Sequence, residues 1–229
     1  MSSHENTWET FWNKTDLLAD WQAPAQEMQD LLPLFQAQQC GRMLDIGCGI
    51  GRHLLLFARA GFEAYGIEPT ASGLAQCREA LQRESIRAHL IRGAMQDLSA
   101  FEAGFFDVVV CWHVIYHAYL ATIVTTLREI RRVLRPGGFL VITFNSTNNK
   151  HFGEGNEVEP NTFIGANNKL DGELPHHFST REEVLSLVEG FRVISIEEKE
   201  DTHVGQVAPQ TCHWHVVAQK HERALDHAS

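Results

Sequence analysis

Three glycines at alternate positions follow a short apolar run that contains an acidic residue. The run is residues 43–46, with Asp45 inside it, and the glycines are Gly47, Gly49 and Gly51. A backbone that bends sharply out of a strand and passes close to a ligand needs residues without a Cβ. The helix-like stretch that follows offers unpaired N–H groups at its first turn. The pattern therefore predicts a nucleotide-type cofactor site at a strand-to-helix turn.

Histidines are the best-placed candidates for general bases. His113 and His117 come just after an apolar run, residues 105–111, with Tyr116 between them. Imidazole can take a proton near neutral pH, although a packing role is the alternative for at least one of this pair. A second pair, His176-His177, closes an irregular segment, and because neighbours in an extended chain diverge, at most one of them points inward. The catalytic candidates are His113, His117 and His177.

Short apolar runs alternate with helical patterns along most of the chain. The expected strands are residues 42–46, 63–67, 87–92, 105–111 and 138–145, and the expected helices are residues 53–60, 71–83 and 119–134. Continuous apolar strands that alternate with helices are typical of a parallel sheet covered on both faces. Two further strands, 191–197 and 211–218, predict an antiparallel hairpin. The predicted fold is α/β, doubly wound, with a mostly parallel seven-stranded sheet and this hairpin at its C-terminal end.

We expect one domain over residues 1–229, with two additions. Residues 1–38 predict a helical cover, as two amphipathic helices broken near Pro24, in which Trp8, Phe11, Trp12 and Trp21 either form a lid or pack between helices. Residues 146–178 show no clean periodicity and predict an irregular insert or lid over the active site. Ser179, with Glu182 three residues later, predicts the N-cap of the next helix.

Four further segments follow the glycine loop in a set order. Gly66-Ile67-Glu68 ends the second strand in an acid, Gly93 to Leu98 follows the third, residues 106–111 form the fourth, and residues 134–138 lead into the fifth. In this order and at these distances the segments resemble the class I S-adenosylmethionine-dependent methyltransferases. The resemblance covers residues 40–145 strongly and the remainder through topology. A looser similarity, through the Gly-x-Gly-Arg loop and the size of the chain, is to bacterial thiol, metalloid or tellurite-type methyltransferases.

The resemblance implies a role for each matching position. Asp45 and the glycine backbone would hold the methionine end of S-adenosylmethionine, Glu68 would hold the ribose diol, and Met95 would lie on the adenine. Cys111 would face the sulfonium. The cofactor-binding residues expected in this way are Trp12, Asp45, Gly47, Cys48, Gly49, Gly51, Arg52, Glu68, Pro69, Met95, Gln96 and Cys111.

One position departs from the family pattern. Many relatives have an aspartate directly after the glycine of the third segment, and here it is Ala94. Gln96, Asp97 or a main-chain carbonyl would then receive the adenine amino group, unless packing alone holds the ring. Arg52 could neutralise a carboxylate of the cofactor or of the substrate, or form a surface ion pair.

Composition narrows the class of protein. The formal net charge of −10 argues against a broad grip on nucleic acid, and 44% hydrophobic with 21% charged residues is typical of a globular protein. An odd number of cysteines, five, without a Cys-x-x-Cys pair predicts reduced thiols and a cytoplasmic location. We expect no membrane span, no metal site and a monomer or homodimer. His203, Cys212, His213 and His215 could bind a metal, but the packing of strand neighbours in a core explains them equally well.

The favoured function is transfer of a methyl group to a small-molecule acceptor, at O, N, S or a metalloid, by in-line displacement, with S-adenosylhomocysteine as product. Glu157, Glu159 and Asn161 in the insert are possible acceptor contacts, with a solvated loop as the alternative. Two other functions stay open: a methyltransferase that acts on RNA or protein, and a non-catalytic S-adenosylmethionine-binding protein. Nothing in the sequence identifies the acceptor.

Overall fold

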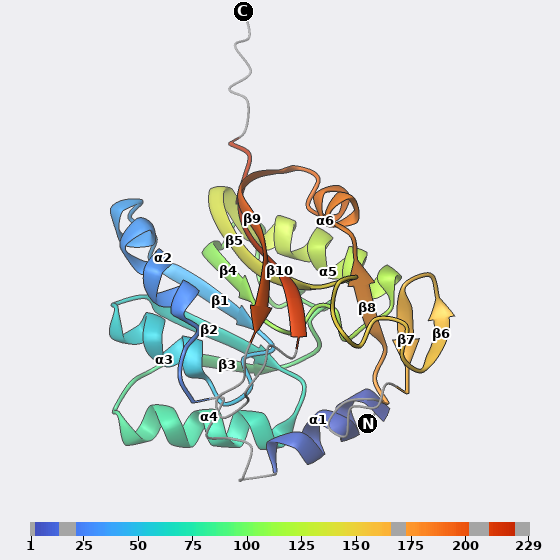
Figure 1. The fold of residues 1–229 in the computed structure, drawn as a ribbon. Coiled ribbons are helices and arrows are strands. Elements are labelled where there is room, and N and C mark those ends of the chain that lie inside the picture. The colour runs from blue at the N-terminus through green and yellow to red at the C-terminus, as the bar shows by residue number, and fades with distance from the viewer. Residues whose placement is uncertain (1–2, 14–21, 166–172, 202–210, 223–229) are drawn as a thin grey trace, which may run out of the picture.

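A computed structural model describes residues 3–13, 22–165, 173–201 and 211–222. At its centre lies a twisted sheet (Figure 1), and seven of its strands run in the order β3-β2-β1-β4-β5-β10-β9. Strands β1 to β5 pair in parallel, and β10 is antiparallel to both β5 and β9. The strands are β1 (Arg42–Ile46), β2 (Glu63–Glu68), β3 (His89–Arg92), β4 (Phe106–Cys111), β5 (Leu134–Ser146), β9 (Phe191–Asp201) and β10 (Thr211–Lys220). The predicted fold class is confirmed.

Helices cover both faces of this sheet because its strands carry apolar side chains on both sides. In β4, Val108 and Val110 pack into a cluster with α2, α3 and α4, while Val109 and Cys111 pack into another with α5 and α6. The helices are α2 (Gln26–Ala37), α3 (Arg52–Arg59), α4 (Ala71–Arg83), α5 (Leu120–Val133) and α6 (Arg181–Leu187). The break expected near Pro24 precedes α2. Within the described ranges, every helix is too short or too polar to cross a bilayer.

The segment expected to be irregular contains three short strands in its described part. They are β6 (Asn156–Glu159), β7 (Thr162–Ile164) and β8 (His176–Ser179), and β8 continues the main sheet by pairing with the last two residues of β5. Glu159 Oε1 accepts a hydrogen bond of 2.6 Å from the Leu120 backbone N–H. This contact ties the small sheet to the N-terminus of α5, while a lid role for the segment stays a prediction.

The N-cap of α6 lies one residue later than expected. Thr180 holds this position, and its hydroxyl accepts a hydrogen bond of 3.3 Å from the Glu183 N–H. Ser179 instead pairs with Ser146 at the end of β8 and is completely buried. The strand register overrides the local capping signal, so the prediction of Ser179 as the cap was wrong.

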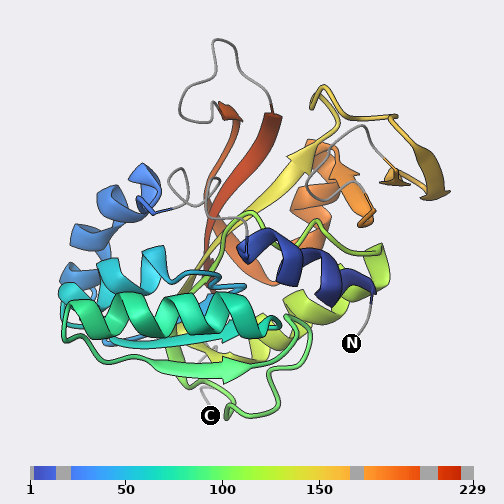
Figure 2. The ribbon, with the colours of Figure 1, turned by 90° about the horizontal axis from the view of Figure 1, so that it is seen from below.

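Helix α1 (Ser3–Trp12) lies beside α4, as Figures 1 and 2 both show. The Glu9 carboxylate accepts hydrogen bonds from the backbone N–H groups of Ala71 (2.9 Å) and Ser72 (3.0 Å), in the first turn of α4. A carboxylate at a helix N-terminus also interacts favourably with the helix dipole. Trp21, expected to belong to the aromatic cover, lies outside the described residues.

Candidate active site

The glycine loop after β1 has the conformation that its sequence predicts. Gly47, Gly49 and Gly51 have φ of +68°, +49° and +85°, in the left-handed region where a Cβ is strained. A Cβ on Gly49 would lie 2.5 Å from the Trp12 ring, and one on Gly51 would lie 2.5 Å from Cys77 Sγ. A Cβ on Gly47 would lie 2.5 Å from Val114 Cγ2, so all three glycines of the loop are required by close contacts as well as by backbone angle.

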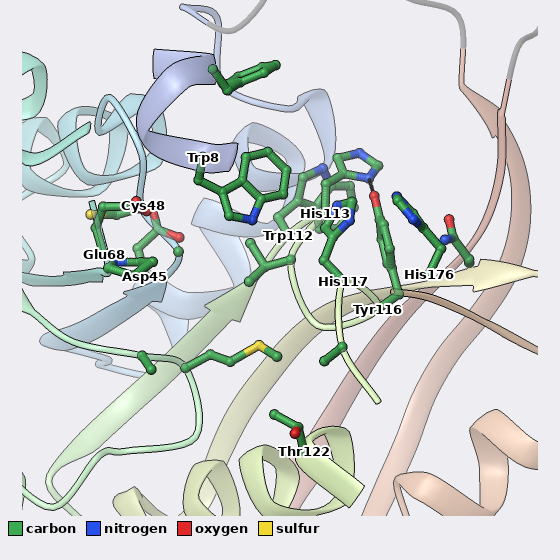
Figure 3. Close-up of a pocket in the computed structure, with 18 of the residues that line it drawn as sticks. Trp8, Asp45, Cys48, Glu68, Trp112, His113, Tyr116, His117, Thr122 and His176 are labelled. Atoms are coloured by element: carbon green, nitrogen blue, oxygen red, sulfur yellow. Dashed lines mark hydrogen bonds between the residues drawn. The ribbon is translucent and has the colours of Figure 1, made fainter. Parts of the chain in front are cut away.

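A cavity of about 620 Å³ opens at the carboxyl ends of the parallel strands, beside this loop. Trp8, Phe11 and Trp12 from α1 line it on one side. Figure 3 shows carboxylates at one end and a group of histidines at the other, with Trp8 between them. We call these ends the carboxylate side, which comprises Asp45, Gly47, Cys48, Arg52, His53, Glu68, Pro69 and Arg92 to Gln96, and the histidine side, which comprises Trp112, His113, Tyr116, His117, Asn145, Asn149, His176, Phe178 and His213.

Asp45 brings a buried carboxylate to the carboxylate side. Its side chain is only 3% exposed, and burial raises its pKa from 3.8 to about 7, partly opposed by the positive charge of Arg52. His53 Nδ1 lies 3.9 Å from Asp45 Oδ2. Since His53 Nε2 accepts a hydrogen bond from the Ala25 N–H, the neutral ring carries its proton on Nδ1, toward Asp45. A cationic group bound next to Asp45 would restore its charge.

Glu68, at the end of β2, is held firmly under the glycine loop. Its Oε2 accepts a hydrogen bond of 3.1 Å from the Gly49 N–H, and its Oε1 accepts from the Thr70 N–H (3.1 Å) and hydroxyl (2.6 Å). Burial raises its pKa, against these hydrogen bonds. Each carboxylate oxygen has two lone pairs, so Oε2 can accept a further hydrogen bond from a hydroxyl in the cavity.

The third segment supplies the far wall of the carboxylate side. Gly93, Ala94, Met95 and Gln96 line the cavity. Asp97 instead accepts hydrogen bonds from the Ser99 N–H (3.2 Å) and hydroxyl (2.6 Å), as in a side-chain turn. Gln96 and Asp97 were the two side chains expected to replace the aspartate that is missing at Ala94. Of these two, only Gln96 lines the cavity.

His113 stands at the centre of the histidine side in an unusual backbone conformation. Its φ is +56°, and its backbone N–H donates a hydrogen bond of 2.7 Å to Thr143 Oγ1 of the neighbouring strand. Its Nδ1 lies 3.1 Å from the Tyr116 hydroxyl, the contact drawn as a dashed line in Figure 3. The His213 ring packs edge-on against it, with centroids 4.6 Å apart. Left-handed residues other than glycine persist only where surrounding contacts hold them, and such residues gather at functional sites.

His117 and His176 extend this group of rings. The His117 ring lies 4.9 Å from Trp8, 4.4 Å from Tyr116 and 4.8 Å from His176. His177 points away from the cavity: its Nδ1 lies 2.8 Å from Thr162 Oγ1 and its Nε2 lies 3.4 Å from Glu183 Oε1. Alternation along β8 thus brings His176, and not the candidate His177, to the cavity.

Several other predicted residues lie elsewhere. Cys111 is completely buried under α5 and outside the cavity lining, and Gly49 and Gly51 lie behind Trp12 and Cys77. Of the insert candidates, Glu159 holds the N-terminus of α5, and Glu157 accepts a hydrogen bond from the Asn161 N–H. His203 lies outside the described residues, and the rest of the chain that the structure describes contains no group of three or more side chains able to hold a metal.

Several residues that line the cavity were not candidates from the sequence, among them Asn145, Asn149 and His213. Asn145 is near the end of β5, Asn149 follows it, and His213 lies on β10 opposite Asn145. Polar residues at the end of a long apolar strand were the available signal for Asn145. His213 gave none, because only the antiparallel placement of β10 beside β5 brings it to the cavity.

Comparison with known proteins identifies the family. Residues 44–142 match the family described as "Methyltransferase domain". Similar curated proteins include a ubiquinone biosynthesis O-methyltransferase from Bradyrhizobium, 30% identical over 111 residues (48% of this chain, 42% of the relative). Another is a tRNA U34 carboxymethyltransferase from Idiomarina loihiensis, 33% identical over 128 residues (53% and 36%). The match spans less than half of the length of either relative.

Solved structures share the fold over almost the whole chain. An S-adenosylmethionine-dependent methyltransferase from Methanosarcina mazei has a TM-score of 0.70 at 23% identity, covering 83% of this chain and 98% of its own. A 1,6-didemethyltoxoflavin-N1-methyltransferase from Burkholderia thailandensis, solved with 1,6-didemethyltoxoflavin and S-adenosylhomocysteine, has a TM-score of 0.66 at 17% identity, covering 97% and 92%. The ordered motifs, the strand order and the family match agree: residues 44–142 are a methyltransferase domain, and the chain around them has the fold of solved S-adenosylmethionine-dependent methyltransferases.

Proposed function

We propose that this protein transfers a methyl group from S-adenosylmethionine to a small-molecule acceptor by in-line displacement. The observation that carries the proposal is a single cavity in which a glycine loop and two buried carboxylates face a group of histidines. Displacement at a sulfonium methyl needs little beyond alignment of donor and acceptor. A cavity that binds both molecules side by side supplies that alignment.

The carboxylate side fits S-adenosylmethionine. The spare lone pair on Glu68 Oε2 suits a ribose hydroxyl. Asp45, whose pKa burial has raised to about 7, suits the ammonium of the methionine end, because a nearby cation restores the carboxylate charge. Met95 and Gln96 offer an apolar surface and an amide for adenine. Trp12 covers Gly49 and Gly73, and an aromatic face also attracts the cationic sulfonium.

The cover over the cavity supports a small acceptor. Trp8, Phe11 and Trp12 line the cavity from α1, and Glu9 holds that helix against α4. A volume of about 620 Å³ is within the usual range for small-molecule sites. An RNA acceptor, suggested by the tRNA-modifying relative, would favour a basic rim, whereas Arg52 and Arg92 are the cationic side chains among the described lining residues. The net charge of −10 also opposes RNA.

Calorimetry with S-adenosylhomocysteine tests the cofactor site. We expect wild-type protein to bind and Glu68→Gln to bind at least about tenfold more weakly, since the lost hydrogen bonds are charge-assisted. Glu63→Gln is the matched control, because Glu63 begins the same strand at its exposed end. Equal weakening by both changes, or tight binding of NAD in place of S-adenosylhomocysteine, would contradict the proposal.

A second measurement tests turnover. Protein is incubated with S-adenosylmethionine and a panel of small acceptors, and release of S-adenosylhomocysteine is followed by mass spectrometry. Release that depends on a small acceptor supports the proposal. Binding without turnover of any acceptor favours the non-catalytic alternative, and turnover of RNA alone favours the macromolecular one. The cytoplasmic location and the oligomeric state stay predictions.

A further inference from the structure

We propose that the acceptor is an uncharged aromatic molecule with a hydroxyl group on its ring, and that His113 takes the hydroxyl proton while Tyr116 positions its imidazole. This inference rests on the methyl transfer proposed above and assigns the substrate class of the same cavity. Three features of the histidine side carry it: its flat walls, its lack of formal charge, and the conformation of His113.

The walls of the histidine side are flat rings. Tyr116 lies between two imidazoles, with centroids 4.4 Å from His117 and 5.2 Å from His213. Trp8 and His176 continue this surface on either side of His117. Ring pairs prefer stacked or edge-on contacts at such distances, so a planar ring gains more here than a flexible aliphatic chain of equal area.

Charge excludes two other classes of acceptor. Among the described residues of the histidine side there is no Asp, Glu, Lys or Arg, and the charged lining residues Asp45, Arg52, Glu68 and Arg92 are on the carboxylate side. The acidic side chains nearby have other partners: Glu154 pairs with His151, and Glu159 with the N-terminus of α5. A cationic amine would therefore enter without a counter-charge, and a carboxylate would gain one only by protonating an imidazole, so each costs free energy on entry.

The presence of imidazole bases beside the cavity favours a hydroxyl over a thiol as the acceptor group. A ring hydroxyl ionises near pH 10, so at neutral pH it needs a base before it can attack, whereas a thiol ionises much more readily. His113 follows β4 directly and faces the cavity (Figure 3). Its strained φ of +56° is held by Thr143, and the backbone carbonyl of Tyr116 is held by the His177 N–H at 2.9 Å. Both members of the pair are therefore fixed at the backbone.

The O–H bond of the acceptor breaks and its proton passes to the His113 imidazole. An oxygen lone pair forms the new bond to the methyl carbon as the carbon–sulfur bond of S-adenosylmethionine breaks, and that electron pair stays on sulfur. The resulting imidazolium donates through Nδ1 to the Tyr116 hydroxyl, which lies 3.1 Å away. The products are a methyl ether and S-adenosylhomocysteine.

A matched panel of acceptors tests the substrate class. Catechol is compared with cyclohexane-1,2-diol, benzylamine, benzoate and thiophenol in the presence of S-adenosylmethionine. We expect catechol to be methylated at least about tenfold faster than cyclohexane-1,2-diol, the factor expected for one favourable ring contact. It should also be methylated faster than benzylamine and benzoate, which carry a charge, and faster than thiophenol, which does not need the base. Preference for benzylamine, benzoate or thiophenol overturns the inference. So does a protein that binds S-adenosylhomocysteine but neither binds catechol nor methylates it. A protein that does not bind S-adenosylhomocysteine refutes the proposed function instead.

The pH profile tests His113 and Tyr116. In the wild type, kcat/KM for catechol should rise through the titration range of imidazole. His113→Asn should lose that rise and about 10²–10³-fold of the rate near pH 7, and should recover activity near pH 10, where the acceptor ionises unaided. Tyr116→Phe should displace the rise along the pH axis. Both variants should bind S-adenosylhomocysteine like the wild type, and His89→Asn, an exposed histidine on β3, is the control. An unchanged profile in His113→Asn overturns its role.

Discussion

Replacing Asp45 by asparagine removes a carboxylate that folding buries at the end of β1. In the unfolded chain this group has its ordinary pKa of 3.8, and in the folded protein burial raises that pKa to about 7. Below pH 3.8 the group is protonated in both states and costs nothing. As the pH rises from there to about 7, the unfolded state gains charge first, so folding loses stability progressively.

The size of this loss follows from the two pKa values. Each tenfold change in an ionisation constant is worth about 1.4 kcal/mol. The rise from 3.8 to about 7 therefore destabilises the unliganded protein by about 4 kcal/mol above neutral pH. Asp45→Asn should recover up to that amount and raise the Tm by about 10 °C at pH 8. At pH 4 the gain should vanish.

Cofactor binding should respond in the opposite way. An ammonium beside Asp45 favours the ionised carboxylate, so the wild type should bind S-adenosylhomocysteine about tenfold more weakly at about pH 6 than at about pH 8. In Asp45→Asn, binding should be weak and independent of pH. Calorimetry at the two pH values measures both effects, and thermal unfolding at about pH 4 and about pH 8 measures stability. Asp97→Asn, at an exposed loop position, is the control.

Three results would refute this reasoning. One is equal affinity of the wild type at both pH values. Another is a pH dependence that persists in Asp45→Asn, which would move its origin to Glu68, the other carboxylate of the cavity with a raised pKa. The last is a lower Tm for the variant than for the wild type at about pH 8, which would show that the buried carboxylate stabilises the fold.

Three further changes have outcomes set by the same geometry. Gly49→Ala should destabilise the protein by about 2 kcal/mol or more and weaken S-adenosylhomocysteine binding, because its Cβ would lie 2.5 Å from Trp12. Gly61→Ala is the control: with φ of +91° and open space around it, it should cost only the backbone strain of about 1 kcal/mol. Equal losses of stability in thermal melts would contradict the contact with Trp12. Thr70→Val removes the cap of α4 and a hydrogen bond to Glu68, so it should cost about 1–2 kcal/mol and weaken binding, while Thr180→Val should cost stability alone. Glu27→Gln tests acid stability: the hydrogen bond from His215 lowers the pKa of Glu27 from 4.5 to about 2, a contribution present above pH 4.5 and lost as the pH falls toward 2. Because the group is only half-buried, we expect the wild type to lose about 2 kcal/mol more than the variant over that range in acid titrations followed by circular dichroism, and parallel curves would show that the pair contributes nothing.

The carboxylate side was predictable because its signals are local. The positive φ of Gly47, Gly49 and Gly51 follows from residue type within one turn of chain. Asp45 and Glu68 belong to neighbouring parallel strands, and the carboxyl ends of such strands meet at one edge of a sheet. Regular alternation of strands and helices predicted the topology for the same reason, since each crossover is short and has one hand.

The histidine side depended on pairings between distant strands. Thr162 pairs with His177 and Phe163 with His176, and this register decides which histidine of the pair reaches the cavity. A slip of one residue would exchange them, and nothing near residue 176 in the sequence marks the register. A second pairing, of β8 with β5, places Ser179 in the strand, so that Thr180 and not Ser179 is the cap of α6.

By itself, the sequence determined the resemblance to methyltransferases, the alternation of parallel strands with helices, and the position of Asp45 and Glu68 on neighbouring strands, because each depends on short-range spacing. Only the tertiary structure decided that His113, His176 and His213 share one wall with Tyr116, because they come from the loop after β4, from β8 and from β10, respectively. The histidine side is assembled from residues up to about a hundred positions apart. Its composition is set by strand register and by the antiparallel insertion of β10, which the local pattern of residues does not encode.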